Sequence, residues 1–270
     1  MNVMLCEKLS LEDAKKMDMS GWVIERKLDG VRAYIENGRL YDRRNKDITK
    51  QFPEFVNLKK MTNQVIDGEI VAASLIFNDV VGRMHMRDKF MIRLQSERSP
   101  AMFIAFDMVR PSMTLADRKQ LLMEFGLSSY CRETFPWLLM LFKEDSFADG
   151  WRRVEENEWE GLVIKRLDAF YQEGKRSPDC LKVKTFQEAT ATFVKMDIHP
   201  KGCRLETADG RSVNVNGAQA EEVIRIFREK GEVIGEVQYL PQSGSEAWRF
   251  PSWRGSKVQG SSGWVRIGER

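Results

Sequence analysis

A lysine stands inside a run of residues that otherwise has the pattern of a β-strand. The stretch VIERKLDGVRAYI, residues 23–35, places Lys27 shortly before an Asp29-Gly30 pair. Its other charged residues are Glu25, Arg26 and Arg32. An Asp-Gly pair is typical of a turn, but a turn gives no reason for so many charges on a strand that leads into a core. The stretch is either a solvated strand edge or a site where Lys27 acts as a nucleophile.

Charged residues recur in three later strand-like segments. These are IDGEIV with Asp67 and Glu69, EGLVIK with Glu160 and Lys165, and LKVKTF with Lys182 and Lys184. Because side chains alternate along a strand, Lys182 and Lys184 share one face, where they repel each other unless an anion or open water lies between them. Each segment alone is more often a solvated strand face. Together they indicate that several charged strands converge on one anion-binding site.

Several familiar catalytic devices are absent from the sequence. It contains no G-x-x-x-x-G-K-[ST], no G-x-G-x-x-G and no protein-kinase signature set. With only His85 and His199, far apart in the chain, a histidine metal centre or a Ser-His-Asp triad is improbable. If the protein uses a nucleotide, it binds it without a glycine-rich cradle.

The composition is that of a globular protein without a membrane partner. The 43 Lys and Arg against 40 Asp and Glu give a formal net charge of +3, which allows a nucleic-acid partner but does not indicate one. No apolar run approaches the roughly 18 residues of a membrane span, and the N-terminus lacks the apolar segment of a signal peptide. The cysteines are Cys6, Cys131, Cys180 and Cys203. Their irregular spacing predicts reduced thiols in a cytoplasmic protein rather than a zinc site.

The pattern of elements predicts two domains. Up to about residue 187, strand-like segments such as 64–72 and 101–109 alternate with helical segments such as 114–125, which indicates a mixed α and β domain. After residue 188 the chain has short strands separated by turns and one helix at 218–231, which fits a small Greek-key barrel of the oligonucleotide-binding (OB) kind. We therefore predict domains over 1–187 and 188–270.

In this order, the charged segments resemble the motifs of the covalent nucleotidyltransferases, and most closely those of the ATP-dependent DNA ligases. The matching residues are Lys27-x-Asp-Gly-x-Arg32, Asp67-Gly-Glu69, Phe106-Asp107, Glu160-Gly-Leu-Val-Ile-Lys165 and Lys182-x-Lys184. The segment LYDRRNKDITKQFPEF, residues 40–55, resembles the ligase segment that carries an arginine after the first hairpin. The resemblance implies an α+β fold, with an adenylation domain of antiparallel sheets and flanking helices followed by an OB-fold barrel. The chain as a whole resembles the minimal two-domain ligases of bacteriophages and bacteria.

The resemblance also implies a role for each matching residue. Lys27 would attack the α-phosphate of ATP and form a lysyl-AMP phosphoramidate, while Lys182 and Lys184 neutralise charge on the reacting phosphates. The nucleotide-binding residues implied are Glu25 for the adenine amino group, Phe106 for stacking on the base, Arg32 and Arg43 for ribose and phosphate, Glu69 for ribose, and Glu160. Arg44 competes with Arg43 for its role. Magnesium is expected at Glu69 and Glu160, directly or through water. Phe106 and Glu25 have simpler interpretations, as a core residue and as a salt-bridge partner in a hairpin.

The implied substrate is nicked double-stranded DNA, sealed by a cytoplasmic monomer of a bacterial or phage-infected cell. Only 26 residues precede Lys27, so no separate DNA-binding domain precedes it in this sequence. The last ligase motif has only a loose counterpart in WRFPSWRGSK, with Arg249, Arg254 and Lys257. Alternatives are an mRNA-capping guanylyltransferase that uses GTP, an RNA ligase, and a non-catalytic nucleic-acid-binding protein. Glu25 and the Phe106-Asp107 pair favour the DNA ligase.

Overall fold

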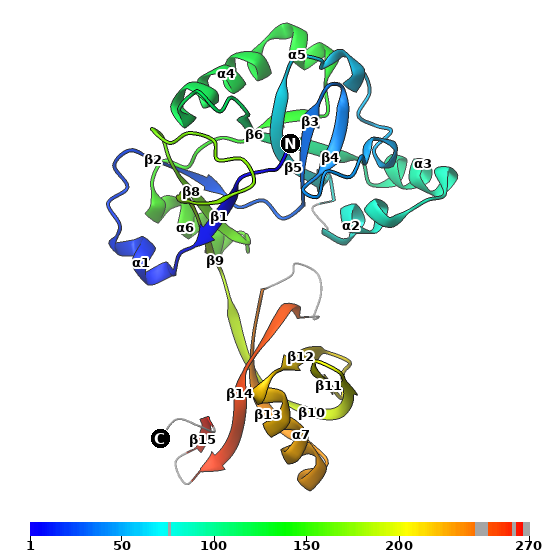
Figure 1. The fold of residues 1–270 in the computed structure, drawn as a ribbon, viewed down its shortest axis with the longest axis vertical. Helices are drawn as coiled ribbons and strands as arrows, with labels where there is room; N and C mark the ends of the chain where they lie inside the picture. The colour runs from blue at the N-terminus through cyan, green and yellow to red at the C-terminus, as the bar shows by residue number, and fades with distance from the viewer. Residues whose placement is uncertain (75–76, 241–247, 261–262, 267–270) are drawn as a thin grey trace. The chain divides into compact units, whose positions relative to one another are not determined.

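The computed structural model describes residues 1–74, 77–240, 248–260 and 263–266. The chain divides into two compact units, Met1–Lys184 and Thr185–Arg270. Figure 1 shows the helices and strands of both. Each unit has a hydrophobic core of its own.

Four strands of the first unit form a sheet in the order β1-β9-β8-β2. They are β1 (Leu5–Lys8), β9 (Arg176–Lys184), β8 (Gly161–Arg166) and β2 (Trp22–Arg26). The β1–β9 pair is parallel and the other pairs are antiparallel. Helices α1 (Leu11–Lys16) and α6 (Phe147–Glu156) pack on this sheet through Ala14 and Trp151. The sheet positions Lys27, which follows directly after β2.

A second sheet of the same unit has the strand order β4-β3-β5-β6-β7. Its strands are β3 (Val31–Glu36), β4 (Arg39–Asp42), β5 (Val65–Ala72), β6 (Ala101–Met108) and β7 (Leu138–Met140). Only the β6–β7 pair among these is parallel. Strand β5 carries Asp67 and Glu69, and its partner β3 places Arg32 directly opposite Glu69.

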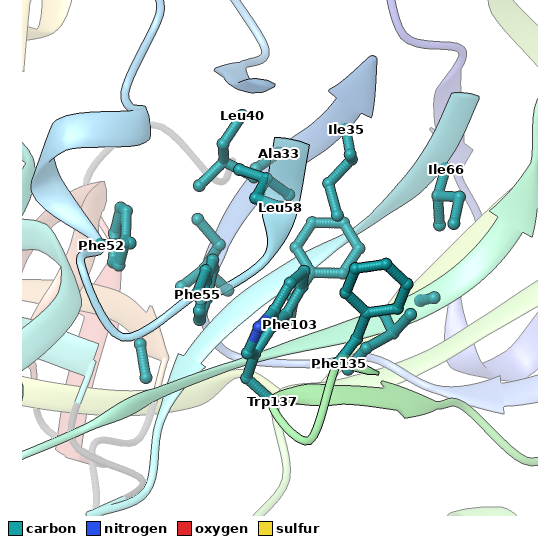
Figure 2. Close-up of a cluster of buried hydrophobic side chains, with 14 of the residues drawn as sticks. Ala33, Ile35, Leu40, Phe52, Phe55, Leu58, Ile66, Phe103, Phe135 and Trp137 are labelled. Carbon is teal, nitrogen blue, oxygen red and sulfur yellow. The ribbon is translucent and has the colours of Figure 1, made fainter. Parts of the chain in front are cut away.

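Short helices flank this second sheet and enclose its core. They are η1 (Thr49–Gln51), η2 (Leu58–Lys60), α2 (Phe77–His85), α3 (Lys89–Arg98), α4 (Leu115–Leu127) and α5 (Ser129–Thr134). Figure 2 shows the core, where aromatic side chains lie against aliphatic side chains of the sheet. Phe55 stacks on Trp137 with ring centroids 4.6 Å apart, and Phe135 meets the same indole edge-on. This packing fixes the strands that carry the charged residues.

Two glycines allow backbone segments to approach each other closely. A Cβ atom on Gly30 would lie 2.2 Å from the carbonyl oxygen of Ile70 on β5. On Gly161, whose φ is +140°, a Cβ atom would lie 1.9 Å from the carbonyl oxygen of Val183 on β9. The glycine of the Asp29-Gly30 pair is therefore required by lack of space beside β5, at a point where the chain bends between β2 and β3.

The second unit is an antiparallel sheet with one helix, in the strand order β12-β11-β10-β13-β14-β15. Its elements are β10 (Gln187–His199), β11 (Gly202–Thr207), β12 (Ser212–Asn216), α7 (Ala218–Lys230), β13 (Val233–Leu240), β14 (Arg249–Gly260) and β15 (Gly263–Arg266). Contacts between β12 and β14 bring the two sides of the sheet together, and the enclosed core includes Phe193 and Trp253. This arrangement is that of an OB-fold barrel. The predicted α+β fold, with antiparallel sheets and flanking helices before an OB-fold, is confirmed.

One prediction about the cysteines is wrong. Cys6 on β1 and Cys180 on β9 form a disulfide, whereas reduced thiols were expected for all four cysteines. The two residues come within bonding distance because β1 and β9 are parallel neighbours, a contact between residues 174 positions apart that spacing alone does not reveal. Cys131 and Cys203 are free and buried. In the described ranges, no helix combines the length and the apolar character that a membrane span requires.

Candidate active site

Two lysines share one carboxylate where strands β2 and β9 end and β8 begins, in the β1-β9-β8-β2 sheet. The Nζ atom of Lys27 lies 2.5 Å from Oε2 of Glu160, and the Nζ atom of Lys184 lies 2.7 Å from Oε1 of the same residue. The backbone N–H of Lys27 donates to the carbonyl oxygen of Gly161 at 2.9 Å, which fixes Lys27 beside the start of β8. Glu160 is 6% exposed, while Lys27 and Lys184 are 21% and 23% exposed. Burial acts to raise the pKa of Glu160, but the two lysines outweigh it and lower that pKa.

Lys182 adds a further positive charge from β9. Burial, together with Arg176, Lys184, Lys27 and Lys8, lowers the pKa of Lys182 to about 8. We call Lys27, Glu160, Lys182 and Lys184 the Lys27 cluster. It contains three lysines and one carboxylate, so it has a surplus of positive charge that suits a polyphosphate.

Glu69 lies close to this cluster and carries a strongly perturbed carboxyl group. Burial raises its pKa to about 7; Lys27 and Arg32 oppose this rise, and Glu160 and Asp67 add to it. Within the described residues no side chain donates a hydrogen bond to Glu69, because Arg32, which lies opposite it in the sheet, donates to Asp67 instead. A carboxylate with this environment gains from a nearby cation. Glu69 and Glu160 therefore fit Mg²⁺, which keeps several waters and needs only one or two protein carboxylates.

A second ionic group is centred on two buried aspartates, Asp67 on β5 and Asp107 on β6. Arg32 donates to both carboxylate oxygens of Asp67, at 2.7 and 2.6 Å, and the hydroxyl of Tyr171 donates to Asp67 at 2.7 Å. Arg118 of α4 donates to both carboxylate oxygens of Asp107, on the neighbouring strand, at 2.8 and 3.1 Å. We call these five residues the Asp67 cluster. Burial acts to lower the pKa of Arg32, but Asp67 outweighs it and raises that pKa, so the guanidinium stays charged.

Glu25 lies between two lysines in the interior. It is 1% exposed, with Lys119 of α4 donating to its Oε1 and the Nζ atom of Lys165 lying 2.8 Å from its Oε2. Burial acts to raise the pKa of Glu25, but Lys119 and Lys165 hold it below its usual value. The same lysine, Lys165, lies 4.4 Å from the ring centroid of Phe106, and Arg32 lies 4.4 Å from it as well. Phe106 is 7% exposed and packs against Leu28.

The structure brings most of the predicted residues together but not all of them. One neighbourhood contains Lys27, Glu160, Lys184, Lys182 and Glu69. Arg32 is linked to it through Glu69, and its guanidinium lies over the ring of Phe106. Lys165 lies over the same ring and pairs with Glu25. Arg43 and its rival Arg44 are exposed residues of the turn after β4. No contact of the described residues links either side chain to the Lys27 cluster. In the second unit Arg249 is buried, Arg254 donates to Gln238, and Lys257 lies 3.2 Å from Glu236.

Lys119 and Tyr171 are functional candidates that the sequence did not reveal. Lys119 lies 94 positions from Glu25 along the chain, and Tyr171 lies 104 positions from Asp67. Lys119 belongs to a helix that was predicted correctly, but helical periodicity does not tell which strand a charged residue reaches. Lys165, by contrast, was present in the quoted EGLVIK motif without a role.

A lysine held by a buried carboxylate, beside further lysines and ahead of an OB-fold barrel, defines the class of covalent nucleotidyltransferases. The sequence model of the ATP-dependent DNA ligase domain matches residues 3–184, which is about two thirds of the chain. The chain belongs to this family. The match confirms the family that the resemblance predicted, and the chain spans about a third of the length of several of the curated relatives that it matches.

Similar proteins agree with this assignment. DNA ligase C1 of Mycolicibacterium smegmatis is 26% identical over 275 residues, covering 89% of this chain and 76% of that protein. The bifunctional non-homologous end joining protein LigD of Bacillus subtilis is 29% identical over 200 residues, covering 62% of this chain but only 32% of that protein. A solved structure from a structure-function study of Lig E DNA ligases has a TM-score of 0.70 at 18% identity, covering 95% of this chain and 99% of that one. At this identity the last likeness concerns the fold alone.

Proposed function

We propose that this protein seals nicks in duplex DNA as a monomer, through AMP bound covalently to Lys27 and then to the 5′-phosphate at the nick. The observation that carries the proposal is the Lys27–Glu160–Lys184 arrangement, in which a nucleophile candidate and a phosphate-binding cation share one carboxylate. Nothing in the packing of the sheet requires two partly exposed lysines there.

In the first step the neutral Nζ atom of Lys27 attacks the α-phosphorus of ATP. An N–P bond forms, the bond between the α-phosphorus and the bridging oxygen breaks, and pyrophosphate leaves; the nitrogen releases one of its two protons to solvent and keeps the other. Glu160 orients the lysine before the attack, since its Oε2 atom lies 2.5 Å from Nζ. Lys182 and Lys184 neutralise the phosphate oxygens as the charge on them shifts.

Magnesium would be held by Glu69 and Glu160, as their charges and surroundings favour. When bound it would supply positive charge to the phosphate oxygens and help to orient them. The raised pKa of Glu69, about 7, supports this role, because a cation would relieve the cost of an ionised and partly buried carboxylate.

The base and sugar would be recognised by the remaining predicted residues. Glu25 accepts a hydrogen bond from the adenine amino group, Phe106 stacks on the base, and Arg32 and Arg43 contact ribose and phosphate. Glu25 is kept ionised by Lys119 and Lys165, which supports its use as an acceptor. For Phe106 to contact a base, Lys165 or Arg32 has to move off its ring.

In the second step AMP passes to the 5′-phosphate of the nick, and in the third the 3′-hydroxyl displaces AMP and closes the strand. We propose that residues 1–187 are the adenylation domain and that residues 188–270 form an OB domain that contacts duplex DNA. Contacts of that kind go mostly to phosphates and need no sequence preference.

One labelling experiment tests this function. The protein is incubated with Mg²⁺ and either α-labelled ATP or α-labelled GTP, and acid-labile label on the chain is measured. We expect label from ATP only, none with Lys27→Ala, and closure of nicked DNA when it is added. Label from GTP alone would favour a capping guanylyltransferase, sealing of RNA only would favour an RNA ligase, and no label would favour a non-catalytic binding protein.

We propose a cytoplasmic location. The alternative is an oxidising compartment, which the Cys6–Cys180 disulfide favours because disulfides persist mainly there. Thiol counting in denaturant on protein isolated without reductant decides between the two. Four thiols would support the cytoplasm, and two, from Cys131 and Cys203, would support an oxidising compartment.

A further inference from the structure

The first unit contains a groove that the proposed chemistry does not use. Its volume is about 1020 Å³, and none of its lining residues belongs to the Lys27 cluster or the Asp67 cluster. Its walls come from η1 and the residues after it, from the α2–α3 connection, and from α3. A ligand bound in this groove would therefore not contact the residues of either cluster.

The charges of the groove do not cancel. Of its two acidic lining residues, Glu54 is paired with the buried Arg83, and Glu97 is paired with Arg93 at 3.2 Å. The other three lining cations are Lys50, Arg87 and Lys89. These three are exposed, and in the described part of the chain they make no ion pair. Asp88, which lies between two of them, turns its carboxylate to the N–H groups of Phe90 and Met91 in its own helix.

A buried arginine holds the walls of the groove in place. Arg83 of α2 is fully buried and donates to Glu54, beyond η1, and to the carbonyl oxygens of Gln95 and Ser99 at the end of α3. Glu54 also accepts from the N–H of Ala101 at 2.9 Å, at the start of β6. One side chain thus connects the three segments that form the walls, so the concave shape exists before any ligand arrives.

The buried part of the groove offers little that could recognise a particular base. Ile92 is buried and apolar, and the hydroxyl of the buried Ser96 already donates to the carbonyl oxygen of Arg93 at 2.7 Å. Pro53 and Met86 add further apolar lining. An apolar floor together with three cations suits a ligand that offers C–H faces and regularly spaced anions.

We propose that this groove binds the sugar–phosphate backbone of duplex DNA, through Lys50, Arg87 and Lys89. The proposal rests on the proposed function, since a nicked duplex extends well beyond the two nucleotides that react. Phosphate contacts of this kind add affinity without sequence preference. They would provide part of the grip on the duplex on either side of the nick.

The test compares two triple variants of the full chain that lower the net charge equally. The groove variant is Lys50→Ala, Arg87→Ala, Lys89→Ala; the control, Lys15→Ala, Lys16→Ala, Arg132→Ala, changes three exposed cations outside the groove. Adenylation without DNA is measured first and should be unchanged in both. Affinity for nicked duplex DNA is then measured by fluorescence anisotropy from 0.05 to 0.3 M salt.

We expect the groove variant to lose about 2.7 from the slope of log affinity against log salt, which is about 0.9 for each lost phosphate contact. If the ionic contribution vanishes at 1 M salt, this change in slope makes the affinity of the groove variant about 500-fold weaker than that of the wild type at 0.1 M salt. The control should keep the wild-type slope within about 1.

Equal slopes for the two triple variants would overturn the groove proposal and leave the proposed function intact. Unchanged DNA affinity together with lost binding of a poly-glutamate peptide would overturn it in favour of an acidic protein partner. A wild-type protein that is adenylated but does not bind nicked DNA would overturn both proposals.

Discussion

The Lys27 cluster and the Asp67 cluster are both ionic, yet they are built in opposite ways. The Lys27 cluster has three lysines and one carboxylate, and Lys27 and Lys184, which pair with Glu160, keep about a fifth of their surface exposed. In the Asp67 cluster two arginines face two aspartates, and Asp67, Asp107 and Arg118 are at most 2% exposed. Surplus charge with access to solvent is what a site for an anionic substrate requires, whereas balanced and buried pairs specify a fold. Substitutions in the first cluster should change chemistry, and those of Asp107 and Arg118 in the second should change stability. Arg32 of the second cluster is 24% exposed and is proposed to bind the nucleotide, so its substitution should change both.

The largest expected effect on chemistry comes from Lys27→Arg. Arginine keeps the positive charge beside Glu160 but lacks the amine that forms the phosphoramidate, so adenylation should fall at least about 10⁴-fold. The midpoint of thermal unfolding should stay near that of the wild type. Residual labelling close to the wild-type rate would remove Lys27 from the nucleophile role.

Arg118→Met should give the largest effect on stability. It leaves Asp107 buried without its partner, and breaking a buried pair in this way costs about 3–5 kcal/mol of unfolding free energy. Urea denaturation at neutral pH measures the loss. The double variant Arg118→Met, Asp107→Asn serves as its control and should recover part of it, because no unpaired charge remains. If Arg118→Met instead abolished adenylation at wild-type stability, the distinction between the two clusters would fail.

Lys119→Met tests the role of Glu25, which belongs to neither cluster. With Lys119 gone, Lys165 is the one cation among the described residues that still pairs with Glu25, so part of the opposition to its burial is lost. We expect the KM for ATP in adenylation to rise about tenfold, the effect of one charge-assisted hydrogen bond, with a smaller change in kcat. Lys119→Arg should restore most of the affinity. Equal losses of kcat and folding stability in both variants would make Lys119 purely structural.

The smallest expected effect concerns pH. The ammonium form of Lys182 is present below its pKa of about 8 and is lost as the pH rises through that value. Since kcat/KM reports the free enzyme, kcat/KM for ATP should begin to fall above about pH 8 in the wild type. In Lys182→Arg the fall should move to higher pH, because the guanidinium does not titrate there. An identical alkaline limb in both proteins would assign it to another group.

The sequence predicted the partners of the Lys27 cluster better than their surroundings. Strand alternation placed Lys182 and Lys184 on one face, and the motif order joined them to Lys27 and Glu160. Lys119 could not be predicted, because it reaches Glu25 from a helix that is distant in the chain. The Cys6–Cys180 contact was hidden for the same reason, since it depends on which strands are neighbours. Arg43 was predicted from its motif alone, and no side chain of the Lys27 cluster contacts it in this state.

The absence of a side chain at Gly30 has a consequence for how the enzyme can change over time. The carbonyl oxygen of Ile70 and the side chains of Glu69 and Val71 occupy the space where a Cβ atom at position 30 would lie. Any larger residue there would push the segment that carries Lys27 away from β5. Position 30 is therefore closed to substitution, although its residue takes no part in the chemistry.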